Sequence, residues 1–175
     1  MDAIAAAAGV SKQTVYQHFG DKQRLFRELV EAVVQAASDP VYDEVRKLAD
    51  SGHLEADLRD LARRLLTLVL QPTMLRLRRL VIAEARQFPE LGRTFYDLGP
   101  GRTIAALAAT FAALRRQGRL NTNDAKLAAT HFNWLVMAAP INKAMLLGSD
   151  DRPTTREINR WADGGVRAFL AAYLP

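Results

Sequence analysis

The side chains best placed to do chemistry lie near the start of the chain. They form the outer face of a helix expected over residues 12–18 and comprise Lys12, Gln13, Thr14, Tyr16, Gln17 and His18. Each can donate a hydrogen bond to a phosphate or a base edge, and none is acidic. Such a face suits a helix that enters the major groove of DNA. The alternative is an ordinary helical hairpin whose polar face is only solvated.

A second short helix, expected over residues 2–8, must hold this face in position. The apolar residues that would face each other across the two helices are Ile4, Ala5, Ala8, Val10, Val15 and Phe19. Gly9 can adopt a positive φ at the turn, and Ser11 can cap the following helix through its side-chain oxygen. The spacing therefore predicts a helix-turn-helix.

The run "DAIAAAAGVSKQTVYQHFGDKQRLF" resembles the helix-turn-helix of the tetracycline-repressor (TetR) family of bacterial transcriptional regulators. The usual family pattern is D-I-A-x-x-A-G-V-S-x-x-T-x-Y-x-H-F-x-x-K-x-x-L, and the match spans about 25 positions with the spacing of that pattern. A weaker resemblance covers residues 73–147, where "RLRRLVIAEARQFPELGRTFYDLGPGRTIAALAATFAALRRQGRL" is similar to the ligand-binding part of the AefR-like branch.

The resemblance implies a role for each polar residue of this segment. Lys12, Gln13 and Gln17 would contact base edges, since Gln can pair bidentately with adenine and Lys can reach guanine. The residues that would hold phosphates are Thr14, Tyr16, His18 and Lys22. Val15 and Phe19 would belong to the core instead.

The resemblance also implies a further helix ahead of Asp2, which would complete a three-helix unit by covering Ile4, Val15, Phe19 and Phe26. We expect this first helix to be missing through an N-terminal truncation. The expected function is a ligand-responsive transcriptional regulator, a repressor released by a small apolar effector. The alternative is an all-helical dimeric module that binds a ligand or a protein and, lacking that helix, reads no DNA.

Apolar residues recur along the whole chain at spacings of three and four, which predicts an all-α protein. The predicted helices cover residues 2–8, 12–18, 21–38, 40–50, 54–71, 73–87, 90–97, 102–117, 123–147 and 155–173. Asp39 and Pro40 predict an N-cap and a first helical position, Thr154 and Glu157 predict a capping box, and Pro140 should kink or split its helix. We expect a DNA-binding region with its connecting helix over residues 1–38 and a helical bundle for ligand binding and dimerisation over residues 39–175.

The interior of this bundle is the expected binding place for a small, mostly apolar molecule. The candidate lining residues are Met74, Leu77, Val81, Phe88, Phe95, Phe111, His131, Trp134 and Met137. The competing interpretation is that most of these residues are plain core. The arginines at 76, 78, 79 and 86 could place one guanidinium near an anionic ligand, although such a run is more often a solvated face.

The last two long helices are expected to pair with their copies in a homodimer. The resemblance implies a two-fold four-helix bundle, whose candidate interface residues are Phe132, Val136, Met145, Trp161, Gly165 and Phe169. Two recognition helices must meet half-sites about 34 to 36 Å apart, which also favours a dimer. The alternative is that these residues form intramolecular core alone.

Other classes of function find little support in the composition. The chain has no cysteine, and its three histidines are His18, His53 and His131, with no catalytic constellation around them. We therefore expect no enzyme, catalytic residue, metal site or cofactor. With no signal peptide and no stretch long enough to cross a membrane, we expect a cytoplasmic protein. The formal net charge of +5 permits a polyanionic partner such as operator DNA.

Overall fold

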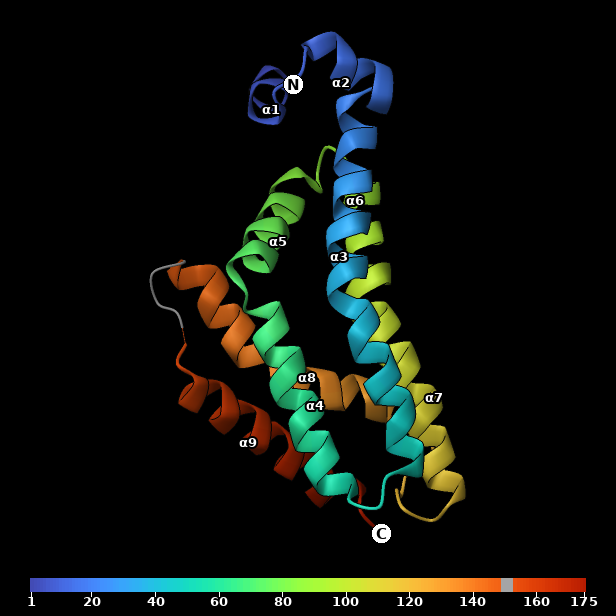
Figure 1. The fold of residues 1–175 in the computed structure, drawn as a ribbon. Helices are drawn as coiled ribbons and strands as arrows, with labels where there is room; N and C mark the ends of the chain where they lie inside the picture. The colour runs from blue at the N-terminus through green and yellow to red at the C-terminus, as the bar shows by residue number, and fades with distance from the viewer. Residues whose placement is uncertain (149–152) are drawn as a thin grey trace.

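Every element in the described part of the chain, residues 1–148 and 153–175 of a computed structural model, is helical. In chain order the elements are α1 (Asp2–Ala8), α2 (Lys12–Phe19), α3 (Lys22–Lys47), a 3-10 turn η1 (Leu48–Asp50), α4 (Leu54–Val69), α5 (Pro72–Glu84), α6 (Pro89–Tyr96), a π turn η2 (Asp97–Gly101), α7 (Arg102–Arg116), α8 (Ala125–Leu147) and α9 (Thr155–Tyr173). Figure 1 shows α1 and α2 at one end of an elongated molecule and α4, α8 and α9 towards the other. The predicted all-α fold with an N-terminal helix-turn-helix is confirmed.

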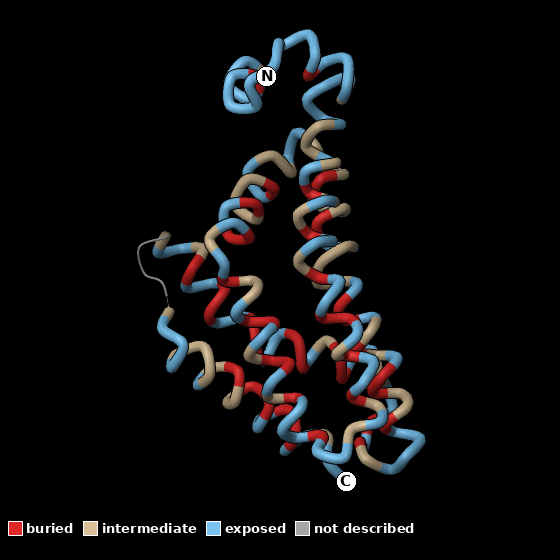
Figure 2. The backbone as a smooth tube through the Cα atoms, viewed as in Figure 1, coloured by how far each residue is buried: buried red, intermediate tan, exposed pale blue. Residues whose placement is uncertain are grey.

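The turn between α1 and α2 forms as the sequence indicates. Gly9 ends α1 with a φ of 66°, and the Ser11 hydroxyl accepts a hydrogen bond from the Thr14 amide at 3.0 Å, which caps α2. Ile4 and Val10, expected to face inward, are instead 39% and 43% exposed. The reason is that α1 packs against α2, which leaves its other faces open to solvent. Figure 2 shows how little of this end of the molecule is buried.

One uninterrupted helix, α3, replaces the two helices expected over residues 21–38 and 40–50. Pro40 sits inside α3 on its exposed side, while Val34, Ser38, Val41 and Val45 lie buried at spacings of three and four. This buried stripe keeps one helical register on both sides of the proline, so its packing outweighs the missing backbone hydrogen bond. The expected N-cap at Asp39 is wrong, because Asp39 lies inside α3 and no helix begins after it. Its carboxylate instead accepts a hydrogen bond from the Arg102 guanidinium at 2.9 Å.

Two other predicted interruptions are also absent from the described helices. The Gly-Pro-Gly run after residue 98 lies in the wide π turn η2, which joins α6 to α7 without an intervening loop. Pro140 does not split α8, which is continuous from Ala125 to Leu147. None of the described helices is long and apolar enough to cross a membrane.

Two apolar clusters hold the bundle together. The larger joins α4, α7, α8 and α9 to the C-terminal half of α3, and its centre is three fully buried rings. Phe111 stacks on Phe169 at a centroid distance of 5.1 Å, and Phe132 meets both rings edge-on. The smaller cluster joins the N-terminal half of α3 to α5 and α6. As a result α3 contributes to both clusters along its length.

Helices α8 and α9 pack closely because α9 presents a glycine to the α8 backbone. A Cβ added at Gly165 would lie 2.9 Å from the Leu135 carbonyl oxygen and 3.0 Å from the Val136 Cα. Gly164, one residue earlier, has open space at the same position. Gly165, predicted as a dimer-interface residue, thus allows the close approach of α8 of the same chain. The predicted capping box of Thr154 and Glu157 begins α9 as expected.

We expect Gly165→Ala to lower the free energy of unfolding by about 1–3 kcal/mol, because a backbone neighbour cannot move aside as a side chain can. Gly164→Ala is the matched control, since it adds a methyl group to open space and raises helix propensity, which is worth about 0.5–1 kcal/mol in the stabilising direction. Urea unfolding of both variants measures the difference. Equal stability of the two variants would show that this close approach does not limit the packing of α8 on α9.

Candidate nucleic-acid interface and internal cavity

One face of α2 packs against its neighbours, and the polar face is exposed to solvent. Val15 is only 4% exposed and fixes the helix on its neighbours, while Ser11 caps its first turn. All seven residues predicted to contact DNA are exposed: Lys12, Gln13, Thr14, Tyr16, Gln17, His18 and Lys22. They lie on α2 and at the first position of α3, so one end of the molecule carries the whole set.

An acidic neighbour of this face was not anticipated from the sequence. Asp2, in the first turn of α1, forms an ion pair with Lys12, whose Nζ lies 3.0 Å from the Asp2 Oδ1. The hydrogen bond from Lys12 lowers the pKa of the Asp2 carboxyl, and the same bond raises the pKa of Lys12. Both side chains are exposed, so water and salt screen the pair. Lys12 can therefore exchange Asp2 for a phosphate or a base edge at small cost.

The start of α3 supplies the other cation of the interface. Asp21 caps α3 by accepting a hydrogen bond from the Arg24 amide at 2.7 Å. Lys22 follows, with its Nζ 5.1 Å from the centre of the Phe26 ring, a cation–π contact that steadies an otherwise exposed side chain.

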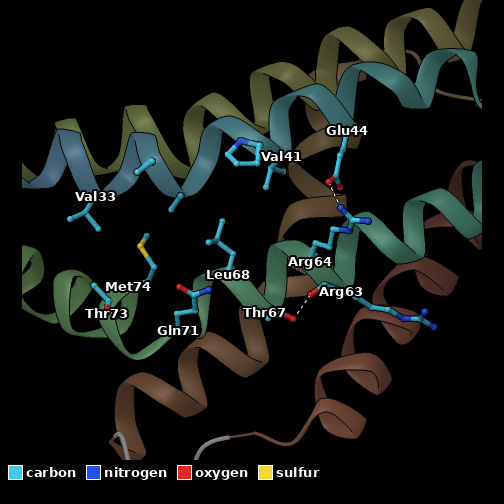
Figure 3. A pocket seen from close by; sticks show the side chains of 13 residues that line it. Val33, Val41, Glu44, Arg63, Arg64, Thr67, Leu68, Gln71, Thr73 and Met74 are labelled. Carbon is cyan, nitrogen blue, oxygen red and sulfur yellow. Dashed lines mark hydrogen bonds and ion pairs between the residues drawn. The ribbon is translucent and has the colours of Figure 1, made fainter.

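An open groove of about 790 Å³ runs between α3 on one side and α4 and α5 on the other. Figure 3 shows Val33 and Val41 on α3 across from Leu68 and Met74, so the floor of the groove is apolar. An ion pair between Glu44 and Arg64 crosses from α3 to α4 at one end. The groove is wide enough for a small organic molecule to approach the bundle interior.

A smaller enclosed cavity of about 50 Å³ lies behind this groove, and we call it the inner cavity. Its lining comes from α3, α4, α5, α6, η2, α7 and α8: Val34, Ser38, Val41, Leu65, Leu68, Val69, Met74, Arg78, Phe95, Gly99, Pro100, Thr103, Asn133 and Met137. Val41, Leu68 and Met74 line both spaces and form the wall between them. The unbranched thioether side chain of Met74 adapts readily to its surroundings, so the wall is most easily rearranged at this residue.

The inner cavity holds an unpaired amide. Asn133 on α8 is 1% exposed, and neither its Nδ2 nor its Oδ1 has a hydrogen-bond partner among the described residues. A buried amide without partners destabilises the protein by the desolvation of both polar atoms. The other polar residues of this lining are Ser38, Arg78 and Thr103.

Arg78 on α5 is the charged residue of the inner cavity. Its guanidinium carbon lies 5.1 Å from the centre of the Phe95 ring, and no carboxylate of the described chain pairs with it. Burial lowers the pKa of this guanidinium from its ordinary value. The neighbouring Arg79 is satisfied differently, because it donates a hydrogen bond to the Ala144 carbonyl at 2.6 Å. Only one arginine of the run thus reaches the cavity.

The residues predicted to line a ligand site separate into three groups. Met74, Phe95 and Met137 line the inner cavity. Leu77, Val81 and Phe88 belong to the apolar cluster of α3, α5 and α6 beside it. Phe111, His131 and Trp134 line no cavity found in the described chain, since Phe111 is the centre of the larger core and the other two are exposed on α8. His131 is also engaged, because its Nδ1 lies 2.6 Å from the Tyr173 hydroxyl.

The residues predicted for a dimer interface lie mostly inside the protomer. Phe132, Val136, Gly165 and Phe169 are buried between α8, α9 and their neighbours, so their side chains offer no surface to a partner. Met145 and Trp161 are partly buried against the same core. The helical period explains why these residues lie in the core, because the most apolar stripe of each helix faces the bundle of its own chain. The apolar side chains left on the outside of α8 are Leu127, Trp134, Leu135, Leu146 and Leu147.

The sequence analysis missed the three uncharged polar residues of the cavity lining, which are Asn133, Ser38 and Thr103. A usable signal existed for Asn133. It follows Phe132 and precedes Val136 and Met137 on the buried face of a strongly apolar helix, where an amide needs a partner. No such signal marked Ser38 or Thr103, because hydroxyls are common on helix faces and can satisfy themselves; Thr103 donates to the Gly99 carbonyl at 3.1 Å.

We expect Asn133→Leu to raise the free energy of unfolding of the ligand-free protein by about 1–3 kcal/mol, since it removes two unsatisfied buried atoms without leaving a void. Thr110→Val is the control, because the Thr110 hydroxyl is also buried but donates to the Val45 carbonyl at 3.0 Å. That variant should be destabilised by about 1 kcal/mol. Thermal or urea unfolding measures both free energies of unfolding. A destabilised Asn133→Leu variant would mean that the Asn133 amide has hydrogen-bond partners in solution.

Comparisons with known proteins agree with this arrangement of a helix-turn-helix ahead of a helical bundle. The family model of bacterial regulatory proteins of the tetR family matches residues 1–29. The model of the AefR-like transcriptional repressor C-terminal domain matches residues 56–175. Among curated proteins, none matches the chain significantly.

Solved structures match over almost the whole chain. A TetR-family transcriptional regulator from Mesorhizobium loti MAFF303099 is 40% identical with a TM-score of 0.92, covering 99% of this chain and 86% of that one. The flavonoid-responsive regulator FrrA is 34% identical with a TM-score of 0.76, covering 100% and 86%. A TetR family transcriptional regulator from Pseudomonas syringae pv. tomato str. DC3000 is 25% identical with a TM-score of 0.75, covering 99% and 85%. The chain therefore belongs to the TetR family of transcriptional regulators, with an AefR-like C-terminal domain.

Proposed function

We propose that the chain is a dimeric repressor that reads operator DNA with α2 and releases it when a small, mainly apolar effector fills the inner cavity. Family membership already implies a regulator rather than an enzyme. The observation that carries the proposal is that α3 contributes residues to both the proposed DNA surface and the inner cavity. Its first residue, Lys22, belongs to the proposed DNA surface, and its Val34, Ser38 and Val41 line the inner cavity.

We assign base-edge contacts to Lys12, Gln13 and Gln17 and phosphate contacts to the hydroxyl, imidazole and lysine donors around them. Their shared exposure at one end of the molecule supports a common DNA-binding surface, and the division between bases and phosphates follows the family pattern. The donors for phosphates are Thr14, Tyr16, His18 and Lys22. A module that binds ligand without reading DNA is less favoured, because residues 1–29 match a family of DNA-binding regulators.

The coupling between the two sites follows from the length of α3. A guest larger than the present cavity must push on its walls, and one wall is the middle of α3. A shift there reorients α2, which α3 carries at its N-terminal end. Coupling of this kind typically changes affinity about 5- to 150-fold and must be reciprocal. The relative FrrA is by name flavonoid-responsive, which supports a planar, largely apolar effector here.

We expect Lys22→Ala to weaken binding to all DNA sequences and to reduce the slope of log affinity against log salt by about 0.9 for each phosphate that is no longer neutralised. Lys47→Ala is the matched control, because Lys47 is an exposed lysine at the opposite end of the same helix. Fluorescence anisotropy with labelled duplex over a salt series gives both slopes. An unchanged slope in Lys22→Ala would contradict the phosphate assignment.

We expect Gln17→Ala to act differently, because a side chain that reads a base edge carries sequence preference rather than general affinity. The variant should relax the preference at one base pair of the operator, with little change in binding to random DNA. The same anisotropy assay with single-base-pair operator variants measures this preference. An equal loss of affinity for operator and random DNA would refute the base-reading role.

The dimer is proposed to form through the outer face of α8 together with α9. Trp134 and Leu135 are 40% and 47% exposed near the middle of α8, and Leu146 is 79% exposed near its end. Apolar side chains repeated along one helix face suit a two-fold interface, in which each residue meets the same surface of a second copy. His131 and Trp134, which line no described cavity, would then serve this interface.

We expect Trp134→Glu to shift the protein from dimer to monomer, because a carboxylate at the centre of an apolar interface must be desolvated on association. Ile82→Glu is the control, since Ile82 is also an exposed apolar side chain, at 62%, but lies on α5. Sedimentation velocity reports the mass of both variants. If Trp134→Glu stays dimeric while remaining folded, the interface lies on another face.

A further inference from the structure

The inner cavity has polar groups that a purely apolar guest would leave unpaired. What we infer from them rests on the proposed function. We propose that the effector is an apolar monocarboxylic acid whose carboxylate pairs with Arg78, and that a further hydroxyl or carbonyl, in acids that carry one, hydrogen-bonds Asn133. The arrangement combines one partly buried cation and one unpaired amide in a pocket whose other lining residues are apolar except for Ser38 and Thr103.

Arg78 defines the charge of the guest. It is the one charged residue among the lining residues of the inner cavity, and it makes no ion pair within the described chain. A single guanidinium balances a single negative charge, and its planar fork binds a carboxylate through two parallel hydrogen bonds. A phosphate monoester with nearly two charges would remain undercompensated in this apolar surrounding. Because burial lowers the pKa of Arg78, an anion beside it would restore the stabilisation that water no longer provides.

Phe95 holds this guanidinium in place. The Arg78 guanidinium carbon sits 5.1 Å from the centre of the Phe95 ring, so the ring supports the cation before a guest arrives. An arginine that is already ordered gives up less side-chain entropy on binding, which favours affinity. Arg76 differs, because it is exposed, lies outside the inner cavity and donates a hydrogen bond to the Thr73 hydroxyl at 3.4 Å.

Asn133 defines the second contact. Both its donor and its acceptor are buried without a partner in the described chain, so a guest that offers a hydroxyl or a carbonyl satisfies at least one of them. A site built around unpaired polar groups rejects analogues that lack the matching group more strongly than an apolar pocket rejects a missing methylene. The body of the acid would contact Met74, Met137 and Leu68, of which Met74 and Leu68 also line the open groove.

The test uses isothermal titration calorimetry of the full chain with four acids of different shape: benzoate, phenylacetate, cinnamate and octanoate, each beside its neutral primary amide. We expect at least one acid to bind the wild type at least tenfold more tightly than its amide. Arg78→Met should then bind that acid at least tenfold more weakly, and Arg76→Met should stay within twofold of the wild type. Failure of all four acids to bind at millimolar concentration, or equal binding of acid and amide, overturns the inference.

Two further variants keep the test decisive. If Arg78→Met does not fold, Arg78→Lys replaces it; the retained charge without the planar fork should bind several-fold more weakly, and unchanged affinity would count against the assignment. Asn133→Leu should weaken an acid that carries a hydroxyl, tested with 4-hydroxycinnamate, more than it weakens cinnamate. Equal weakening of the two acids overturns the assignment of Asn133.

The same titrations separate this inference from the proposed function. If an acid binds through Arg78 but leaves DNA affinity unchanged, the anion site stands and ligand-controlled release fails. If the acids do not bind but their neutral amides enter the cavity and release DNA, ligand control stands and the anion site is refuted.

Discussion

The rest of the structure depends on the continuity of α3. A single helix from Lys22 to Lys47 carries α2 at one end, borders the inner cavity in its middle and enters the larger core at its other end. Pro40 costs this helix a hydrogen bond, yet the buried stripe through Val34, Val41 and Val45 keeps it whole. In the proposed mechanism a continuous helix passes a push from the cavity to α2, whereas a broken helix would absorb it.

The inner cavity contains polar groups that lower the stability of the protein. Asn133 is buried with two unsatisfied atoms, and Arg78 is partly buried with no carboxylate of the described chain beside it. Either feature alone would weaken an ordinary core, because uncompensated polar groups in an apolar interior are costly. Together in one small cavity they favour a guest with complementary polarity. The surrounding core of Phe111, Phe132 and Phe169 supplies packing that can tolerate this local cost.

The sequence was sufficient for the helical class, the helix-turn-helix and its caps, since turn chemistry at Gly9 and Ser11 is local. It was not sufficient where tertiary packing competes with a local signal. Pro40 indicates a helix start, and only the stripe buried against α6 and α7 overrules it. The cavity lining was found in part, because apolar periodicity cannot distinguish core residues such as Phe111 from wall residues such as Met137.

The measurement that tests the central claim most directly is methyl NMR of the methionines with and without DNA. The chain has four methionines, of which Met74 and Met137 line the inner cavity and Met145 lies outside it. A duplex selected by the protein from random-sequence DNA would be added to saturation. The account predicts that the Met74 and Met137 signals shift while Met145 changes little, because DNA binding and the cavity share α3. Tight DNA binding with unchanged Met74 and Met137 signals would contradict it.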